Sequence, residues 1–284
     1  MNNKVIACLD GSSMVASVAD AGAWVSKTLS APLTLIHVLD HEAQAHDQAA
    51  KNAETIPHQT SRMLAKLASI EDQQKLLSRE RGQLVLDFAH DQIQENHQIE
   101  AKKRLIEGEL VDVLGDLSEE TRVLVVGKRG ESAANEDLGG HLTKLIRASH
   151  RPTMVVTEPF TPPTKVLLAF DGSETMIKAI NTVANSQLFK NLECHVVMVG
   201  AETDEHKEQL QWAENTLAEN GLKTQVQLLV ETDLEKTLNQ YAQKVGINMM
   251  VMGAYSHTRL RQLMMGSHTA TLLRETNITL LILR

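Results

Sequence analysis

Short apolar runs alternate with amphipathic stretches along the whole chain. The runs are rich in Val, Ile and Leu, which favours strands, and the stretches between them repeat apolar residues at helical spacing. The predicted strands are Lys4–Leu9, Leu33–Val38, Gln98–Leu105, Val123–Val126, Thr153–Thr157, Val166–Phe170, His195–Val199, Gln225–Val230, Ile247–Met252 and Ile278–Leu283. The predicted helices are Met14–Leu29, one starting near Gln73, Glu109–Leu117, His141–Ala148, Met176–Ala184, Lys207–Asn220, Leu234–Val245 and His268–Glu275.

This alternation predicts an α/β fold. Strands that are apolar over nearly their whole length are typical of parallel sheets covered on both faces by helices. Right-handed crossovers then wind the helices onto both faces. We therefore expect two tandem, doubly wound, Rossmann-like domains, each with a five-stranded parallel sheet of strand order 3-2-1-4-5.

Two segments of the first half recur, in the same order, in the second half. Val5–Ser12 corresponds to Val166–Ser173, and each is an apolar run that ends in Asp-Gly-Ser. Val123–Gly130 corresponds to Met249–Ser256 in the same way. Two repeats in one order indicate a tandem duplication, so the question becomes what one unit does and whether both copies still do it.

The boundary between the units is marked by proline. Residues Thr157–Thr164 contain three of the chain's six prolines, which makes this linker short and stiff. The predicted domains are 1–158 and 159–284, and such a linker favours packing of one against the other. We expect them to pack through their last strands, Thr153–Thr157 and Ile278–Leu283, as an intramolecular copy of a dimer. A further homodimer is compatible with the sequence.

The first half carries a long polar insert from Asp40 to about Asp72 that the second half lacks. A lid, a partner-binding arm and a plain surface helix would all be compatible with its composition. The surface helix is the favoured interpretation of the three.

Charge and cysteine content narrow the function classes. The net charge of −8 argues against nucleic acid as the main partner, because neutralising phosphates needs a basic face. Cys8 and Cys194 lie in apolar runs of different halves, which is typical of buried thiols in a reducing compartment. Neither a signal-peptide pattern nor an apolar run of the ~20 residues that span a membrane is evident. We expect a cytoplasmic protein without a membrane partner.

Polar residues and glycines follow the first and fourth predicted strands of each half. These are Asp10 and Gly127 in the first half, and Asp171 and Gly253 in the second. In a doubly wound sheet the carboxyl ends of these two strands flank the crevice in which ligands bind. We therefore expect each pair to converge on one crevice, where Asp171 could accept from a ribose hydroxyl and Val199 could lie against a base.

A longer pattern begins at Gly253 and reads Gly253-x2-Ser256-x9-Gly266-Ser267, after which a helix starts. Glycine lets the backbone approach a phosphate closely, and a helix start presents free amides to an anion. Each part alone has an ordinary explanation, because Asp-Gly-Ser is common turn chemistry and Gly-Ser is a common helix start. The combination at these spacings, after strands one and four, is much more specific.

With these motifs the chain resembles the universal stress protein family over essentially its whole length, as two tandem family domains. The family's nucleotide-binding pattern is Gly-x2-Gly-x9-Gly-(Ser/Thr), from which the second half departs only at Ser256. In nucleotide-binding members the Asp after the first strand contacts the nucleoside and the glycine pattern wraps the phosphates. By resemblance, the second-half residues in these roles are Asp171, Val199, Gly253, Ser256, Gly266, Ser267 and Thr269. The weaker first-half candidates are Asp10, Val38, Gly127, Gly130 and Gly140.

The first half departs further from the family pattern. Gly127 and Gly130 are intact and a spacing of nine leads to Gly140, but His141 follows it in place of Ser or Thr. Aligning the following helices instead puts Gly139 at this position, with a spacer one residue short. Either way the phosphate-binding hydroxyl is missing, so we expect the first domain to bind nucleotide poorly or not at all.

Two further groups of residues have ordinary explanations. Lys128 and Arg129 could compensate for the missing hydroxyl by charge, although a solvated loop pair is the favoured account. His37, His41 and His46 have ligand-like spacing, yet no Cys or third fixed ligand joins them, so no metal site is expected.

The predicted function is regulatory. ATP or AMP, with or without magnesium, would be held mainly in the second domain, and its occupancy would bias domain packing or the choice of an unidentified protein partner. No residue is placed as an evident general base, so the most enzyme-like activity expected is slow ATP hydrolysis. The main alternative is an interaction or scaffold module that has lost nucleotide binding, which Ser256 and the degenerate first domain favour. An enzyme of a related α/β superfamily is disfavoured, because no further catalytic motif is present.

Overall fold

The computed structural model describes residues 3–39, 58–130, 142, 145, 146, 149–253 and 267–283. In the first half the elements are β1 (Lys4–Leu9), α1 (Val15–Leu29), β2 (Leu33–Leu39), α3 (His58–His97), β3 (Ala101–Glu107), α4 (Leu110–Asp116), β4 (Thr121–Gly127) and β5 (Thr153–Val156). In the second half they are β6 (Lys165–Ala169), α6 (Glu174–Asn185), β7 (Glu193–Val199), α7 (Asp204–Glu219), β8 (Lys223–Leu229), α8 (Leu234–Val245), β9 (Met249–Gly253), α9 (Ser267–Glu275) and β10 (Thr279–Leu283).

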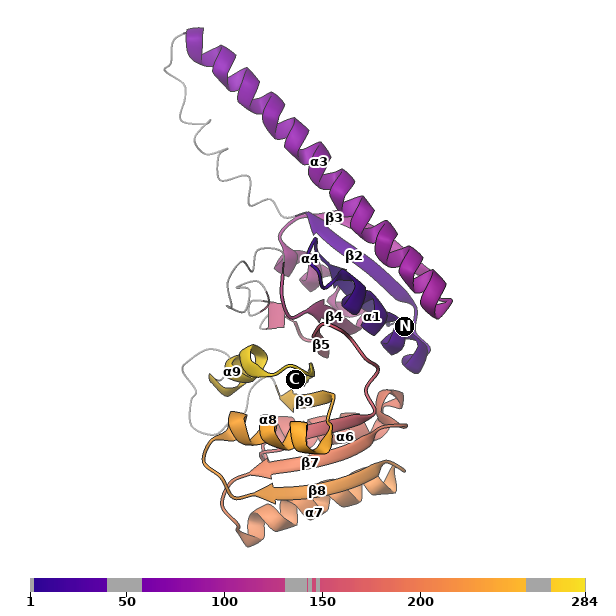
Figure 1. The fold of residues 1–284 in the computed structure, drawn as a ribbon, viewed down its shortest axis with the longest axis vertical. Coiled ribbons are helices and arrows are strands. Elements are labelled where there is room, and N and C mark those ends of the chain that lie inside the picture. Colours follow the sequence, from indigo (N-terminus) through magenta and orange to yellow (C-terminus); the bar gives the residue numbers. More distant parts are fainter. Residues whose placement is uncertain are drawn as a thin grey trace.

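All described strands form one continuous sheet of order β3-β2-β1-β4-β5-β10-β9-β6-β7-β8 (Figure 1). Each half therefore has the predicted order 3-2-1-4-5, with parallel neighbours throughout. The halves meet where β5 and β10 run antiparallel, with Met154 opposite Leu281. The predicted pairing through the last strands is confirmed, and it makes the two halves a pseudo-symmetric pair.

The core lies on both faces of this sheet, because successive strand residues point to opposite sides. Along β1, Val5 and Ala7 face the side covered by α1, α3, α6 and α7, whereas Ile6 faces the side covered by α4, α8 and α9. Burial on both faces explains why the strands read as continuous apolar runs.

Helix α8 shows how local signals set an element's ends. The side chain of Asp233 accepts from the amide of Lys236 at 3.1 Å and caps the helix start, and Gly246, with φ 75°, ends it in the left-handed conformation. The sequence predicts the same bounds, Leu234–Val245. By contrast, the helix predicted at His141–Ala148 falls almost wholly outside the described residues, of which 142, 145 and 146 are helical.

Helix α3 corrects the interpretation of the insert. The helix starts at His58 rather than near Gln73, so the second part of the insert is the beginning of one long surface helix. Its carboxyl-terminal part packs on the first half through buried Leu86, Ala89 and Ile93, while its amino-terminal part projects away from the sheet (Figure 1). Residues 58–72 are helical, as the favoured surface-helix interpretation expects, and residues 40–57 lie outside the described part of the chain.

Candidate functional site

The carboxyl ends of the first and fourth strands of each half lie side by side. β1 pairs in parallel with β4, and β6 pairs in parallel with β9, so their ends reach the same edge of the sheet. Asp10 follows β1 and Gly127 is the last residue of β4, while Asp171 follows β6 and Gly253 is the last residue of β9. The convergence expected from the sequence is present in both halves.

In the first half the two loops at this edge press against each other. The Oδ1 atom of Asp10 accepts from the Ser12 amide at 3.0 Å and from the Ser12 hydroxyl at 2.5 Å. A Cβ built at Gly130 would lie 3.2 Å from Oδ2 of Asp10, and one built at Gly127 would lie 3.0 Å from Cβ of Met14. Both glycines permit this close approach, and the Asp10 carboxylate is engaged by its own loop.

In the second half the corresponding carboxylate is more open. Asp171 is exposed, and within the described residues the amide of Ser173 is its one hydrogen-bond donor, at 3.0 Å from Oδ1. The Ser173 side chain does not turn back to Asp171, because it caps α6 by accepting from the amide of Met176 at 3.3 Å. The same Asp-Gly-Ser sequence therefore leaves one carboxylate engaged and the other presented to solvent.

Helix α7 contributes two side chains to this edge. Gln209 lies over Gly172, where a Cβ would come within 2.3 Å of its Oε1. His206 lies over Gly200, just beyond Val199 at the end of β7, and its Nδ1 donates to the carbonyl of Ala201 at 2.7 Å.

Gly253, at the end of β9, closes the edge from the other side. A Cβ there would lie 3.0 Å from Cγ2 of Thr175 and 3.4 Å from Sδ of Met176, at the start of α6. The absence of a side chain lets the β9 end approach the helix start whose first amides face this edge.

The chain matches the universal stress protein family over residues 1–157 and 195–284. A universal stress protein from Synechocystis is 32% identical over 286 residues, covering 99% of both chains. This chain belongs to the universal stress protein family. Its fold is similar to the crystal structure of a universal stress protein from Archaeoglobus fulgidus, with a TM-score of 0.74 at 16% identity, covering 100% of this chain and 99% of that one. A functionally unknown protein from Pseudomonas aeruginosa PAO1 is also similar, with a TM-score of 0.58 at 15% identity, covering 99% of this chain and 92% of that one.

The described residues include only part of the family's nucleotide motif. Asp171, Gly253 and Val199 are at the carboxyl edge, and Val199 is half-buried at the end of β7. Ser267 begins α9 and Thr269 lies in its first turn. In the first half Val38 is half-buried near the end of β2. The candidates Ser256, Gly266 and Gly140 lie outside the described residues.

Sequence reasoning missed His206 and Gln209. Both stand on the helix that follows the second strand, three residues apart and hence on one face. That helix faces the carboxyl edge in this fold, so polar residues at this spacing in its first turns were a usable signal.

Lys128 is not the solvated loop residue that the sequence favours, because it is half-buried and hydrogen-bonded. Its side chain donates across the interface between the halves, to the main-chain carbonyls of Arg274 and Thr276 at the end of α9. Burial, with a smaller contribution from the charge of Arg129, lowers the pKa of Lys128. A residue held in this way is not available to bind phosphate in the first half.

The thiols offer no nucleophile to this site. Burial, reinforced by the charge of Asp10, raises the pKa of Cys8 to about 12, and burial raises that of Cys194 to about 12. Both thiols are therefore protonated at neutral pH, and both are unpaired. Among the described residues, three or more His, Cys, Asp or Glu side chains nowhere gather as they would around a metal ion. None of the described helices has the length and apolar character to cross a membrane.

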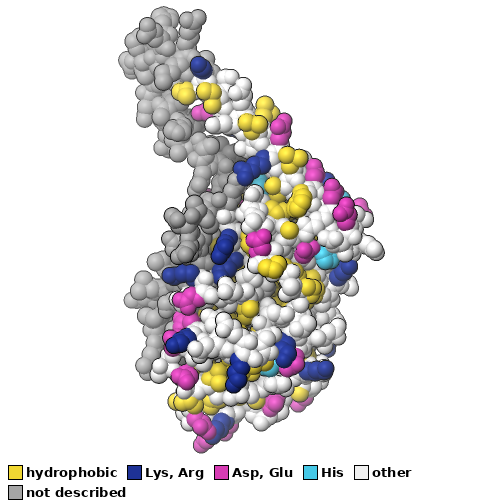
Figure 2. All heavy atoms as spheres, viewed as in Figure 1, with side chains coloured by type: hydrophobic (Ala, Val, Ile, Leu, Met, Phe, Trp, Pro, Cys, Tyr) yellow, Lys and Arg dark blue, Asp and Glu magenta, His cyan; other side chains and the backbone are white. Residues whose placement is uncertain are grey.

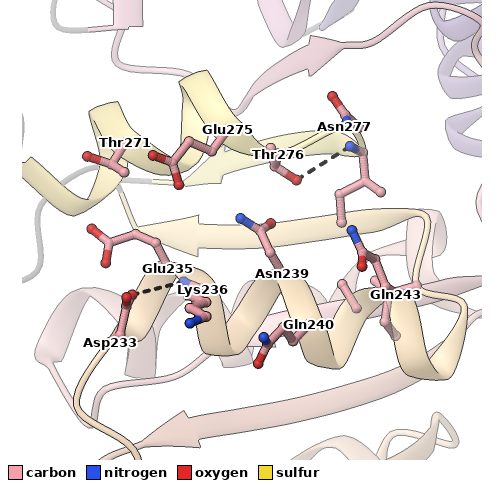
Figure 3. A pocket seen from close by; sticks show the side chains of 13 residues that line it. Asp233, Glu235, Lys236, Asn239, Gln240, Gln243, Thr271, Glu275, Thr276 and Asn277 are labelled. Atoms are coloured by element: carbon pink, nitrogen blue, oxygen red, sulfur yellow. Dashed lines mark hydrogen bonds between the residues drawn. The ribbon is translucent and has the colours of Figure 1, made fainter.

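A cavity of about 630 Å³ lies away from the carboxyl edge, between α8 and α9 (Figure 3). Its lining is mixed, with the polar side chains of Asn239 and Gln243 on one helix opposite Thr271 and Glu275 on the other, and the apolar Ile247 beside them. A cavity of about 170 Å³ occupies the corresponding groove of the first half, beside α4. Because the groove recurs at the equivalent place, it follows from how helices cover this sheet.

Proposed function

We propose that the chain binds an adenine nucleotide, ATP or AMP, at the carboxyl edge of the second half. The supporting observation is the contrast between Asp171 and Asp10. Asp171 is exposed and keeps acceptor capacity for a ribose hydroxyl, whereas Asp10 is held by Ser12 and pressed against Gly130. By the family resemblance, Gly253, Ser256, Gly266, Ser267 and Thr269 would surround the phosphates.

Within this proposal Val199 and His206 would flank the base. Val199 ends β7 half-buried, and His206 holds the loop that follows it through the Ala201 carbonyl. The unpaired thiols fit a reducing, cytoplasmic setting. The protein would act as a regulator in which occupancy biases the packing of the halves or the choice of partner, with magnesium accompanying ATP.

The alternative is an interaction module of the same fold that no longer binds nucleotide. The observation that favours it is the position of Gln209, whose side chain lies on the Gly172 turn beside Asp171. Ser256, at a position where the family pattern has glycine, favours it as well.

Isothermal titration of the full chain, freed of bound ligand, with ATP, ADP and AMP in the presence of magnesium separates the two. The proposal predicts saturable binding of close to one nucleotide per chain, because only the second half is competent. Two nucleotides per chain would refute the assignment of the first half as degenerate. Lack of binding at millimolar ligand would refute the proposal and favour the interaction module.

A further inference from the structure

Helix α3 carries an exposed apolar stripe along its length. Leu67, Ile70, Leu77, Leu84 and Phe88 are 46%, 42%, 64%, 69% and 58% exposed. Figure 2 shows hydrophobic side chains following this helix from its projecting part onto the body of the protein. We refer to these five residues as the seam.

The seam has the spacing of a coiled coil. Its residues follow one another at intervals of three, seven, seven and four, so all five fall on the two apolar positions of a heptad repeat. The two places that would complete the alternation are polar, Gln74 and Arg81. A strict repeat of seven residues keeps an apolar stripe facing one partner helix over its whole length. A helix that packs on a globular core does not need such a strict repeat.

The helix already has a different face for its own domain. Gly82, Leu86, Ala89 and Ile93 are buried against α1 and the sheet. Leu84 and Leu86 are two residues apart, which places them on opposite sides of a helix. The seam is therefore a second apolar face, and folding of the first half does not account for it.

A shallow groove of about 420 Å³ runs beside the seam where α3 meets the start of α1. Leu84 and Phe88 of the seam line one side of it, and Val15 and Ala16 of α1 line the other. The apolar surface is thus concave at the docked end of α3, where the side chains of another helix could enter.

We propose that the seam pairs with the seam of a second copy of this chain, in an antiparallel coiled coil. The distribution of charge along α3 is the reason for proposing a second copy as the partner and an antiparallel direction for the pair. The projecting residues 58–80 contain four Lys and Arg against three Asp and Glu, whereas residues 81–97 contain one against three. Antiparallel pairing sets the projecting part of each copy on the acidic part of the other.

The flanking charges fit this direction. In the register that sets Leu67 opposite Leu84 of the partner subunit, Ile70 lies opposite the partner's Arg81 and Gln74 opposite the partner's Leu77, so each polar residue of the seam meets an apolar one. Lys66 then flanks the partner's Asp87 on each side of the two-fold axis, where it adds a second cation to a carboxylate that already pairs with Lys103 of its own chain at 2.6 Å. A parallel pair would instead set Arg81 against Arg81 in the interface, with like charges in contact.

The overlap is short, but the helices that form it are already ordered. In this register the seams overlap from Leu67 to Leu84, about 27 Å of helix, and Phe88 lies beyond the partner's Leu67. The docked part of each helix is held by its own domain before pairing, which lowers the cost of ordering a contact of less than three heptads. The proposal is independent of nucleotide binding.

The test is the mass of the full chain in solution, by light scattering across a range of concentrations, with a matched pair of variants. We expect the native protein to be a dimer, with twice the 31.4 kDa mass of one chain. Leu77→Glu lies in the seam and should halve the mass. Leu76→Glu, on the neighbouring residue with 60% exposure against 64%, should leave it unchanged. Both positions are exposed, so circular dichroism should show both variants folded.

A native chain of 31.4 kDa at all concentrations would overturn the proposal, including the case in which residues 40–57 of the same chain cover the seam. A dimer that survives Leu77→Glu would overturn it too. Direction is tested by mild oxidation of cysteine variants, with the native chain as blank. A mixture of Ile70→Cys and Arg81→Cys proteins should cross-link, whereas Arg81→Cys alone should not; the reverse result would overturn the antiparallel arrangement.

Discussion

The side-chain nitrogen of Lys128, in the first half, lies 3.0 Å from the main-chain carbonyl oxygen of Arg274, in the second half. The same nitrogen donates to the carbonyl of Thr276, so one cation serves two acceptors at the end of α9. The last carbonyls of a helix lack partners within the helix, and a positive charge there also meets the negative end of its dipole. The equivalent residue of the second half is Ala254, so the sequence supplies this cap in one direction only.

Replacing Lys128 with Met should lower the free energy of unfolding by about 1–2 kcal/mol, since it leaves two carbonyls without their donor but keeps the apolar stem. Part of this loss of stability is offset, because the variant no longer has to bury the positive charge of Lys128. Urea unfolding of the full chain measures the change. Arg129→Met, at the exposed neighbouring residue, is the control and should change stability by less than about 0.5 kcal/mol. Equal losses in the two variants would contradict the capping role.

A second prediction concerns acid stability. Glu193 accepts from Nε2 of the buried His195 at 2.9 Å and from Nε2 of Gln225 at 3.1 Å, and Lys165 lies 3.7 Å away. The hydrogen bond from His195, more than the charge of Lys165, lowers the pKa of Glu193 below its ordinary value of 4.5. The unfolded chain therefore binds this proton more readily, so the carboxylate's stabilising contribution is fully present above pH 4.5 and is lost as pH falls through the lowered pKa.

Glu193→Gln should accordingly flatten the fall in stability on the acid side of this range. Unfolding in urea at a series of pH values, with native chain and variant side by side, measures the slope. Glu219→Gln, at an exposed position of α7, is the control and should keep the native slope. A Glu193→Gln chain that loses stability as steeply as the native chain would show that this carboxylate does not contribute.

The strand order and the pairing of the halves were predictable from the sequence for one physical reason. A strand buried on both faces, such as β6 with Val166, Leu167 and Leu168, must be apolar throughout. Such a run can be recognised in the sequence without knowing which strands lie beside it. The right-handed sense of the crossovers then winds the helices onto both faces of the sheet. The prediction that Asp10 and Gly127 lie at one edge follows directly.

The start of α3 and the role of Lys128 could not be predicted in the same way. Every described side chain from Lys66 to Arg81 is exposed, so this part of α3 has no buried face to give a one-sided core pattern. The heptad spacing of its apolar residues was readable, but it indicates a partner helix and not a core. The acceptors of Lys128 are 146 and 148 residues away, and only the tertiary arrangement brings them together.

The turn at Gly172 gives a third prediction. Its φ of 71° lies in the left-handed region, and a Cβ would also meet Gln209. Gly246 has a similar φ of 75° but nothing within 4 Å of a Cβ, so it isolates the backbone strain. Gly246→Ala should cost about 1–2 kcal/mol of unfolding free energy. Gly172→Ala should cost more, because the Gln209 side chain must also move.

Urea unfolding of the two alanine variants measures this difference, and adding Gln209→Ala to Gly172→Ala should remove it. If the two single variants lose the same free energy, Gln209 moves aside freely, and it would then pose no obstacle to a ligand at Asp171.

The last prediction bears on the nucleotide site itself. Asp171→Asn keeps the acceptor for the Ser173 amide but removes the charge that would hold a ribose hydroxyl. A hydrogen bond to a charged group contributes about 1.5–3 kcal/mol, so affinity for the adenine nucleotide should fall by roughly tenfold or more. Asp10→Asn, the matched change in the first half, should leave affinity nearly unchanged, because the first half is expected to bind little or no nucleotide. Titration of both variants with ATP and AMP decides the matter: equal losses would show that both halves bind, and unchanged affinity in Asp171→Asn would remove this carboxylate from the site.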